Sequence, residues 1–336
     1  MELIYIGAFP PKWGGVTVKN KDVYNELIKT GLSIRKIDIG KIKREKSVSE
    51  CISLVSALMG RDNRLIIGIS AASRRSFVKL LHIINRKTMN RSIMLVMGGA
   101  AAKEIAGDRD DRKRMSEFKR IYVETQGMRH LLTESGMKNV SIYPNCRKRR
   151  MQCPGTKKEC EKLQCVFFSL IQKEKGVDEI LETAGKMPNV DFTFYGHIDN
   201  EYLDEFKRDV ERLSNCTYKG VFRGTDELKY RELSKYDVML LPTKWDREGI
   251  PGILVEAKIA GLSCIVSNVS YNAEIVQNNV NGIVLTRNDS SCLTEAIRSL
   301  NEDRGKLEKQ KEESFKSAEN YYIENYIDSI IHDIRE

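Results

Sequence analysis

Short apolar runs alternate with longer segments of helical periodicity in the first half of the chain. The apolar runs are rich in Ile, Leu and Val, and the segments between them repeat apolar residues every three or four positions. The pattern predicts strands at Leu3–Gly7, Ile34–Ile39, Leu65–Ile69, Ile93–Met97, Ile121–Val123 and Val140–Tyr143. It predicts helices at Val18–Lys29, Glu50–Met59, Arg74–Ile84 and Met128–Ser135. Such alternation is typical of a parallel sheet with helices on both faces.

The same alternation restarts after a basic, polar stretch, Cys146–Lys162, which lacks periodicity and is interpreted as a linker. Further strands are predicted at Cys165–Ser169, Asp191–Tyr195, Thr217–Lys219, Asp237–Leu241, Ser263–Ser267 and Gly282–Leu285. Helices are predicted at Val177–Ala184, Asn200–Leu213, Thr225–Leu233, Ile253–Ala260 and Cys292–Leu300. The tail, Ser314–Arg335, has the pattern of one long amphipathic helix.

A chain of 336 residues suits two domains better than one. We predict an α/β protein with domains at 1–148 and 163–313, a linker at 149–162 and a C-terminal helix at 314–336. Both domains are expected to be doubly wound and Rossmann-like, facing one another across a cleft. Open α/β sheets bind ligands at the carboxyl ends of their strands, so the site is expected there.

The first residues, MELIYIGAFPP, have no basic segment before their short apolar run, which argues against a secretory signal peptide. No window approaches the ~18 apolar residues that a spanning helix needs. We therefore expect a cytoplasmic protein, with any membrane contact made by its surface.

Four of the eight cysteines lie close together in the sequence, at Cys146, Cys153, Cys160 and Cys165. Their spacing is wider than that of zinc ribbons, and Lys and Arg residues lie between them. Reduced thiols in a linker are the favoured interpretation, and a metal site is the alternative. The four histidines are scattered along the chain, so we expect no catalytic metal.

The charge is divided unevenly along the chain. Residues 1–155 hold 31 Lys and Arg against 14 Asp and Glu, whereas the remainder holds 25 against 33. A basic half indicates an anionic partner. No RNA-binding or helix-turn-helix motif accompanies the charge, so nucleic acid is disfavoured. An anionic membrane surface or a phosphate-bearing substrate fits better, and a solvated basic face is the alternative.

A glycine pair, Gly14-Gly15, follows the first predicted strand and opens a helix. The surrounding sequence matches neither GxGxxG nor GxxxxGK[ST], so hydride transfer with NAD and P-loop ATPase chemistry lose their main support. Glycines at a helix N-terminus allow backbone amides to approach a phosphate closely. A plain turn explains the pair equally well.

The most informative segment follows the strand that ends at Leu241. It contains Glu248-Gly-Ile-Pro-Gly and then a helix with Glu256, which Gly261 is expected to end. Carboxylates only accept hydrogen bonds, which suits the vicinal hydroxyls of a sugar or ribose. The alternative is an N-terminal glutamate favoured by the helix dipole together with an exposed helical glutamate.

This segment, EGIPGILVEAKIAGLSCIVSNVSYNAEIVQNNVNGIVL, resembles the donor site of retaining GT-B glycosyltransferases of family 4, whose two signature glutamates correspond to Glu248 and Glu256. The stretches DFTFYGHID, YKGVF, YDVMLLPT and KEKGVDEI agree with the same family. In the first half, GGV, VMGG and IYVETQGMRHLLTESGMKNVSIYPN are similar to the branch that builds bacterial capsular and other surface polysaccharides. The resemblance implies a GT-B fold in which the last helix returns to the first domain.

The resemblance also implies residue roles. Glu248 would be the catalytic residue and would hold the donor sugar with the amides of Gly249 and Ile250, while Glu256 would hold the ribose. The diphosphate would lie against Gly14, Gly15 and Lys175, and the base near Gly220, Val221 and Arg223. The implied enzyme is a metal-independent glycosyltransferase of the hexosyltransferase type with no cofactor. Its donor would be a UDP- or GDP-sugar and its acceptor a glycan or lipid-linked precursor.

One departure from the family pattern concerns the diphosphate. The family has an Arg where this chain has Leu170, and Lys173, Lys244 and Arg247 are the candidate replacements. The departure leaves an inactive homologue that acts as a binding partner open as one alternative. A nucleotide-sugar epimerase of GT-B fold is another, although the scarcity of histidines argues against its acid–base chemistry.

Overall fold

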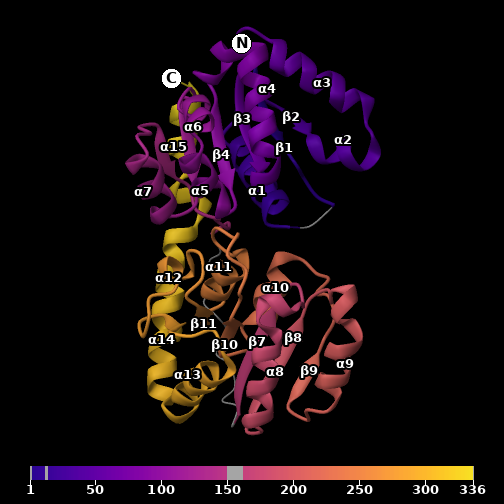
Figure 1. Ribbon diagram of the computed structural model, residues 1–336, viewed down its shortest axis with the longest axis vertical. Helices are drawn as coiled ribbons and strands as arrows, with labels where there is room; N and C mark the ends of the chain where they lie inside the picture. The colour runs from indigo at the N-terminus through magenta and orange to yellow at the C-terminus, as the bar shows by residue number, and fades with distance from the viewer. Residues whose placement is uncertain (1, 12–13, 150–161, 336) are drawn as a thin grey trace. The chain divides into compact units, whose positions relative to one another are not determined.

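A six-stranded parallel sheet forms the centre of the first of two units (Figure 1), in the order β2-β1-β3-β4-β5-β6. The computed structural model describes residues 2–11, 14–149 and 162–335. The first unit comprises Met1–Arg149, Arg247–Ile250 and Tyr321–Glu336. Its strands are β1 (Leu3–Gly7), β2 (Ile34–Asp38), β3 (Arg64–Ser70), β4 (Ile93–Met97), β5 (Arg120–Val123) and β6 (Val140–Ile142).

Helices cover both faces of this sheet. The first unit holds α1 (Gly15–Lys29), α2 (Ile39–Glu45), α3 (Val48–Met59), α4 (Ala71–Met89), α5 (Ala100–Gly107), α6 (Arg109–Met115), α7 (Gln126–Glu134) and α15 (Ile327–Arg335). The connection from β1 to β2 runs to one side of β1, and the later connections run to the other. Because such crossovers are right-handed, α1 lies on the face opposite to α3–α7. α15 contacts α1 and completes that layer.

A second six-stranded parallel sheet, in the order β12-β11-β10-β7-β8-β9, forms the centre of the second unit, Arg150–Asp246 with Pro251–Asn320. Its strands are β7 (Leu163–Phe168), β8 (Val190–Tyr195), β9 (Cys216–Tyr218), β10 (Val238–Leu241), β11 (Ser263–Ser267) and β12 (Gly282–Leu285). Its α-helices are α8 (Val177–Lys186), α9 (Leu203–Glu211), α10 (Asp226–Leu233), α11 (Gly252–Ile259), α12 (Asn272–Ile275), α13 (Ser290–Glu302) and α14 (Arg304–Ser317).

The predicted fold class, α/β with two Rossmann-like domains, is confirmed, and each predicted strand is present within a residue or two. That the domains face one another across a cleft stays a prediction. Most of the helices that sequence reasoning missed are short; the exception is α14, whose 14 residues begin at Arg304, before the predicted tail helix. α6, for example, is RDDRKRM, which has no apolar periodicity; Asp108 caps it by accepting from the amides of Asp110 and Asp111.

The prediction of one long helix at Ser314–Arg335 is wrong. α14 ends at Ser317, and two short 3₁₀ turns, Ala318–Tyr321 and Ile323–Asn325, precede α15. The backbone of Arg147 bonds to this segment on both sides, since its N–H donates to the carbonyl of Tyr321 (2.8 Å) and its carbonyl accepts from Ile323 (2.9 Å). A continuous helix would use those groups internally. The chain therefore passes to the first unit at Tyr321.

The apolar residues of the tail pack into the first unit. Its core cluster includes Tyr5, Val23, Leu27, Ile66, Leu95, Tyr122, Tyr143, Ile323, Ile327, Ile330 and Ile334. Asp333 of α15 also accepts hydrogen bonds from Arg120 (3.0 Å) and Tyr122 (2.8 Å). The burial and these bonds explain why the tail belongs to the first unit.

Two expectations concern parts of the chain that the structure does not describe. Most of the predicted linker, 149–162, lies outside the described residues, as do Cys153 and Cys160.

Among the described residues, none of the helices has the length and apolar content needed to cross a bilayer.

Candidate functional site

The loops after β7, β8 and β9 meet at the carboxyl edge of the second-unit sheet. Gly196, directly after β8, has φ +145°, and a Cβ there would lie 1.7 Å from the carbonyl oxygen of Ser169. The Gly196 amide donates to the carbonyl of Gly220 (3.0 Å). Only glycine fits this close approach. The predicted base-adjacent residue Gly220 is therefore held against the end of β8, and Val221 beside it is 48% exposed.

An aromatic cluster that sequence reasoning missed lies beside this edge. The rings of Phe168 and Tyr195 are stacked with centroids 4.9 Å apart, and Phe222 lies 5.8 Å from Phe168. Phe168 and Phe222 are partly exposed. Stacking on aromatic rings is a common way to hold a nucleobase. The signals in the sequence were the aromatic residues that end two strands, Phe168 of β7 and Tyr195 of β8, and Phe222 within the predicted base-adjacent loop.

Glu232 fixes the buried end of this cluster. The hydroxyl of Tyr195 donates to the Glu232 carboxylate, and burial together with that bond holds the pKa of Tyr195 far above its usual value. Burial by itself would raise the pKa of Glu232, but hydrogen bonds from Lys235 and Tyr195 lower it to about 2. Tyr195 is thus a neutral donor and Glu232 a carboxylate.

The loops after β7 and β10 are joined through their backbones. The amide of Lys244 donates to the carbonyl of Glu174 (2.7 Å), and the hydroxyl of Thr243 donates to the same oxygen (3.2 Å). Gly176 has φ +77°, and a Cβ there would lie 2.1 Å from the Pro242 carbonyl oxygen. These contacts hold the two loops side by side, so the backbones of the predicted diphosphate cations, Lys175 and Lys244, lie on adjoining loops.

The side chains of the candidate cations already have carboxylate partners or are buried. Lys175 is 5% exposed. Lys244 pairs with Glu179, and Lys173 with Glu205 at 2.7 Å. In the first unit, Arg247 lies 3.6 Å from Glu104. Leu170 is 39% exposed, so the position of the family's Arg is open to solvent.

Glu256 is buried within α11. It is 6% exposed, and one of its carboxylate oxygens lies 2.9 Å from the Nζ atom of Lys229 on α10. The alternative interpretation as an exposed helical glutamate is therefore wrong. Pro251 is the N-cap of α11, and Gly261, at φ +75°, follows its end as predicted. A buried carboxylate at this position requires polar partners.

The segment Arg247–Ile250 belongs to the first unit. The Ile250 amide donates to the carboxylate of Glu124 (3.2 Å), and its carbonyl accepts from Asn145 (2.9 Å). A Cβ on Gly249 would lie 1.9 Å from the same carboxylate. The Ile250 amide was predicted to hold the donor sugar, but the structure gives it this other partner. Glu124 was not among the predicted donor-site residues.

Glu124 is itself held by a buried lysine. The Nζ atom of Lys19 lies 2.9 Å from its carboxylate and donates also to the carbonyl of Tyr143 (3.2 Å). The two side chains are 3% and 6% exposed. Lys19 on α1 and Glu124 at the end of β5 are far apart in sequence, so no local pattern could have paired them.

Gly14 and Gly15 open α1 without steric need for glycine. Gly14 has an extended backbone, and a Cβ at either position would meet nothing within 4 Å. Both are exposed, and among the described residues no side chain caps α1. The fold by itself would accept larger residues at both positions, so contact of the pair with a phosphate stays a prediction.

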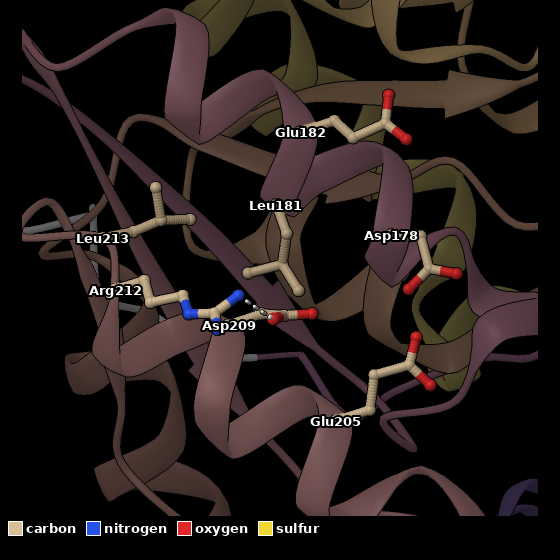
Figure 2. A pocket seen from close by; sticks show the side chains of 7 residues that line it. All are labelled: Asp178, Leu181, Glu182, Glu205, Asp209, Arg212 and Leu213. Carbon is tan, nitrogen blue, oxygen red and sulfur yellow. Dashed lines mark ion pairs between the residues drawn. The ribbon is translucent and has the colours of Figure 1, made fainter.

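A cavity of about 440 Å³ lies between α8 and α9 (Figure 2). It is lined by Asp178, Leu181, Glu182, Glu205, Asp209, Arg212 and Leu213. Figure 2 shows Arg212 directed toward Asp209, which lies 3.8 Å away. Four carboxylates against one guanidinium repel an anion, so this cavity does not suit a nucleotide diphosphate. Among the described residues, no cluster of three or more His, Cys, Asp or Glu could hold a metal ion.

Solved structures of the same fold match nearly the whole chain. The Anabaena protein HepE, solved with UDP, has a TM-score of 0.72 at 12% identity and covers 99% of both chains. Sucrose-phosphate synthase from Thermosynechococcus elongatus has a TM-score of 0.77 at 12% identity and covers 100% of this chain and 98% of that chain. The chain has the GT-B fold. The carboxyl edge at which β7, β8 and β10 end belongs to the second of the two Rossmann-like domains.

Sequence comparisons agree for this second domain. Residues 154–317, just under half of the chain, match the family model of glycosyl transferases group 1. An Escherichia coli UDP-Gal:alpha-D-GlcNAc-diphosphoundecaprenol alpha-1,3-galactosyltransferase is 29% identical over 35% of this chain and 30% of its own length. The amylovoran biosynthesis glycosyltransferase AmsK of Erwinia amylovora is 32% identical over 42% and 36%. The chain thus spans well under half the length of these curated relatives.

Proposed function

We propose that this GT-B chain is a retaining glycosyltransferase of the hexosyltransferase type, which transfers a sugar from a UDP- or GDP-sugar to a glycan or lipid-linked acceptor in surface polysaccharide synthesis. The observation that carries the proposal is the segment from Glu248 to Glu256, in which the second glutamate is buried on α11. The segment lies inside the stretch similar to group 1 glycosyltransferases.

The nucleoside is expected at the aromatic edge of the second domain. The base would lie near Gly220, Val221 and Arg223, with Phe222 and Phe168 available for stacking. Glu256 would accept hydrogen bonds from the ribose hydroxyls. The ion pair from Lys229 would hold that carboxylate in one orientation.

The diphosphate is expected against Lys175 and Lys244 on their adjoining loops, with Gly14 and Gly15 adding backbone amides. The departing diphosphate gains negative charge, so fixed cations and amide dipoles stabilise the transition state. Lys244 would exchange Glu179 for the phosphate. No metal or cofactor is required in this scheme.

Transfer with retention would take place on one face of the sugar. The bond between the anomeric carbon and the leaving phosphate oxygen breaks, and the acceptor oxygen bonds to the same carbon from the same side. The acceptor proton passes to the donor phosphate. Glu248 would hold the donor sugar hydroxyls during this step.

A UDP-sugar and a lipid-linked acceptor are the first candidates to test. The name of the Escherichia coli relative specifies UDP-Gal and a diphosphoundecaprenol acceptor, and HepE was solved with UDP. With such an acceptor, the enzyme would work at the inner face of the cell membrane as a peripheral protein of the cytoplasm.

The test is a panel of UDP- and GDP-sugars, with binding measured by calorimetry and transfer by product analysis. We expect Glu248→Ala and Glu256→Ala each to abolish transfer while circular dichroism stays unchanged. Glu295→Ala, the same change at an exposed helical glutamate, is the control. Wild-type activity in both site variants would refute the site.

The same panel separates the two alternatives. An epimerase would convert the free nucleotide sugar without acceptor, and an inactive binding partner would bind no donor at all. Either result would replace the transferase proposal.

A further inference from the structure

The outward face of α3 in the first unit is apolar. Val48, Ile52, Val55 and Met59 lie at helical spacing, with exposed fractions of 69%, 64%, 55% and 65%. This spacing aligns them in one stripe along the helix. On the described helix, Ala57 and Leu58 are the fully buried residues. α3 therefore exposes more large apolar side chains than it buries.

α4 extends this stripe into a patch. Leu80, Ile83 and Ile84 are 46%, 70% and 44% exposed. The side chain of Asn85 donates to the carbonyl of Gly60 at the end of α3 (2.9 Å), so the carboxyl ends of both helices lie together. Figure 1 shows α3 at the outer margin of the first unit and α4 next to it, over the sheet. We call Val48, Ile52, Val55, Met59, Leu80, Ile83 and Ile84 the α3–α4 patch.

Basic residues predominate in the segment that carries the patch. Residues 39–89 hold 11 Lys and Arg against 3 Asp and Glu. The three acidic groups are all engaged: Glu45 lies 3.9 Å from Arg44, Glu50 accepts from the Asp38 amide, and Asp62 pairs with Arg91. Five exposed cations have no ion-pair partner among the described residues, namely Lys41, Lys46, Arg61, Lys79 and Lys87.

We propose that the α3–α4 patch is a docking surface for an anionic bilayer, with its apolar side chains in the interface and its cations against lipid phosphates. Apolar residues flanked by Lys and Arg are the composition of interfacial helices. The inference rests on the proposed function for its purpose, because a lipid-linked acceptor lies in a membrane.

A second copy of the chain fits the patch less well. Two such patches would bring their uncompensated cations together, which repels.

The experiment is flotation of the full-length protein with vesicles of phosphatidylglycerol and phosphatidylcholine in equal parts, and with pure phosphatidylcholine. Binding is expected to the anionic vesicles and to weaken as salt rises. Ile52→Glu combined with Val55→Glu should lower the bound fraction at least tenfold. Lys46→Gln and Lys79→Gln should each lower it roughly fivefold. Val280→Glu, at an exposed apolar residue of the second unit, is the matched control.

Cys51, exposed on the same helix, is a site for an environment-sensitive dye whose emission should shift to the blue on anionic vesicles. Equal binding of the Ile52 and Val55 variant, or no binding by the wild type, would overturn the inference. So would a dimer by light scattering that this variant dissociates, which would assign the patch to a second copy. Donor binding, measured on the same samples, reports the proposed function separately.

Discussion

The buried pair of Lys19 and Glu124 is the sharpest test of the structure. The perturbation is a double-mutant cycle with Lys19→Met, Glu124→Leu and the combination of both. Each single change leaves one charge in an environment where the partner side chains are 3% and 6% exposed. Glu124→Leu also leaves the amide of Ile250 without its acceptor.

The magnitude follows from burial and geometry. Removing one member of a buried ion pair costs about 3–5 kcal/mol, because the other charge stays desolvated. An unsatisfied buried amide costs about 1–3 kcal/mol. The double variant has no unpaired charge and should lose little beyond the amide's share. Its loss of stability should therefore be smaller than the sum of the two single losses by several kcal/mol.

The assay is urea unfolding followed by hydrogen exchange of peptides from β1 and β3, which report the first unit alone. With a slope of about 2 kcal/mol per M, Lys19→Met should lower the midpoint by roughly 1.5–2.5 M, and Glu124→Leu, which also leaves the Ile250 amide without its acceptor, by roughly 2–4 M. Arg91→Met, which breaks an exposed pair in the same unit, should lower it hardly at all. Single variants that behave like Arg91→Met, or losses that add fully in the double variant, would refute the reasoning.

Further predictions concern single sites. Gly196→Ala should cost about 1–3 kcal/mol and weaken donor binding, because its Cβ would overlap a neighbouring carbonyl; unchanged urea midpoint and affinity would contradict this. Leu170→Arg should tighten nucleotide-sugar binding by about tenfold to a hundredfold in calorimetry by restoring a charge-assisted contact, whereas weaker binding would indicate a site arranged around other cations. Because the pKa of Glu232 is lowered from 4.5 to about 2 on folding, the stability it contributes is present above pH 4.5 and lost as pH falls toward 2; Glu232→Gln should flatten acid unfolding over that range. Iodoacetamide at pH 8 should label exposed Cys51 quickly and spare Cys146, whose pKa burial raises to about 12, as peptide mass spectrometry would report; equal labelling would contradict that burial.

Much of the fold could be predicted because its signals are local. A buried parallel strand needs a short run of apolar residues, and a helix against a sheet needs apolar residues at helical spacing. Strands such as Ile93–Met97 and Ser263–Ser267 therefore agree with the structure to the residue. The end of α11 at Gly261 was predictable for the same reason, since a left-handed C-terminal residue favours glycine.

The failures have local causes too. α6 is short and charged, so its cap rather than its periodicity defines it. The tail has apolar residues at helical spacing on both sides of Tyr322, yet its backbone bonds to Arg147 instead of to itself. A contact with a residue so distant in sequence leaves no periodic trace.

The sequence by itself determined the two α/β units, the position of the Glu248–Glu256 segment after a buried strand, and the concentration of positive charge in the first half. Only the tertiary structure decided which groups face one another: Glu256 with Lys229, and Glu124 with Lys19 and Ile250. It also decided that the apolar stripe of α3 faces outward. Periodicity is encoded by neighbours along the chain, whereas the partner of a charge and the covering of a face depend on residues that only folding brings together.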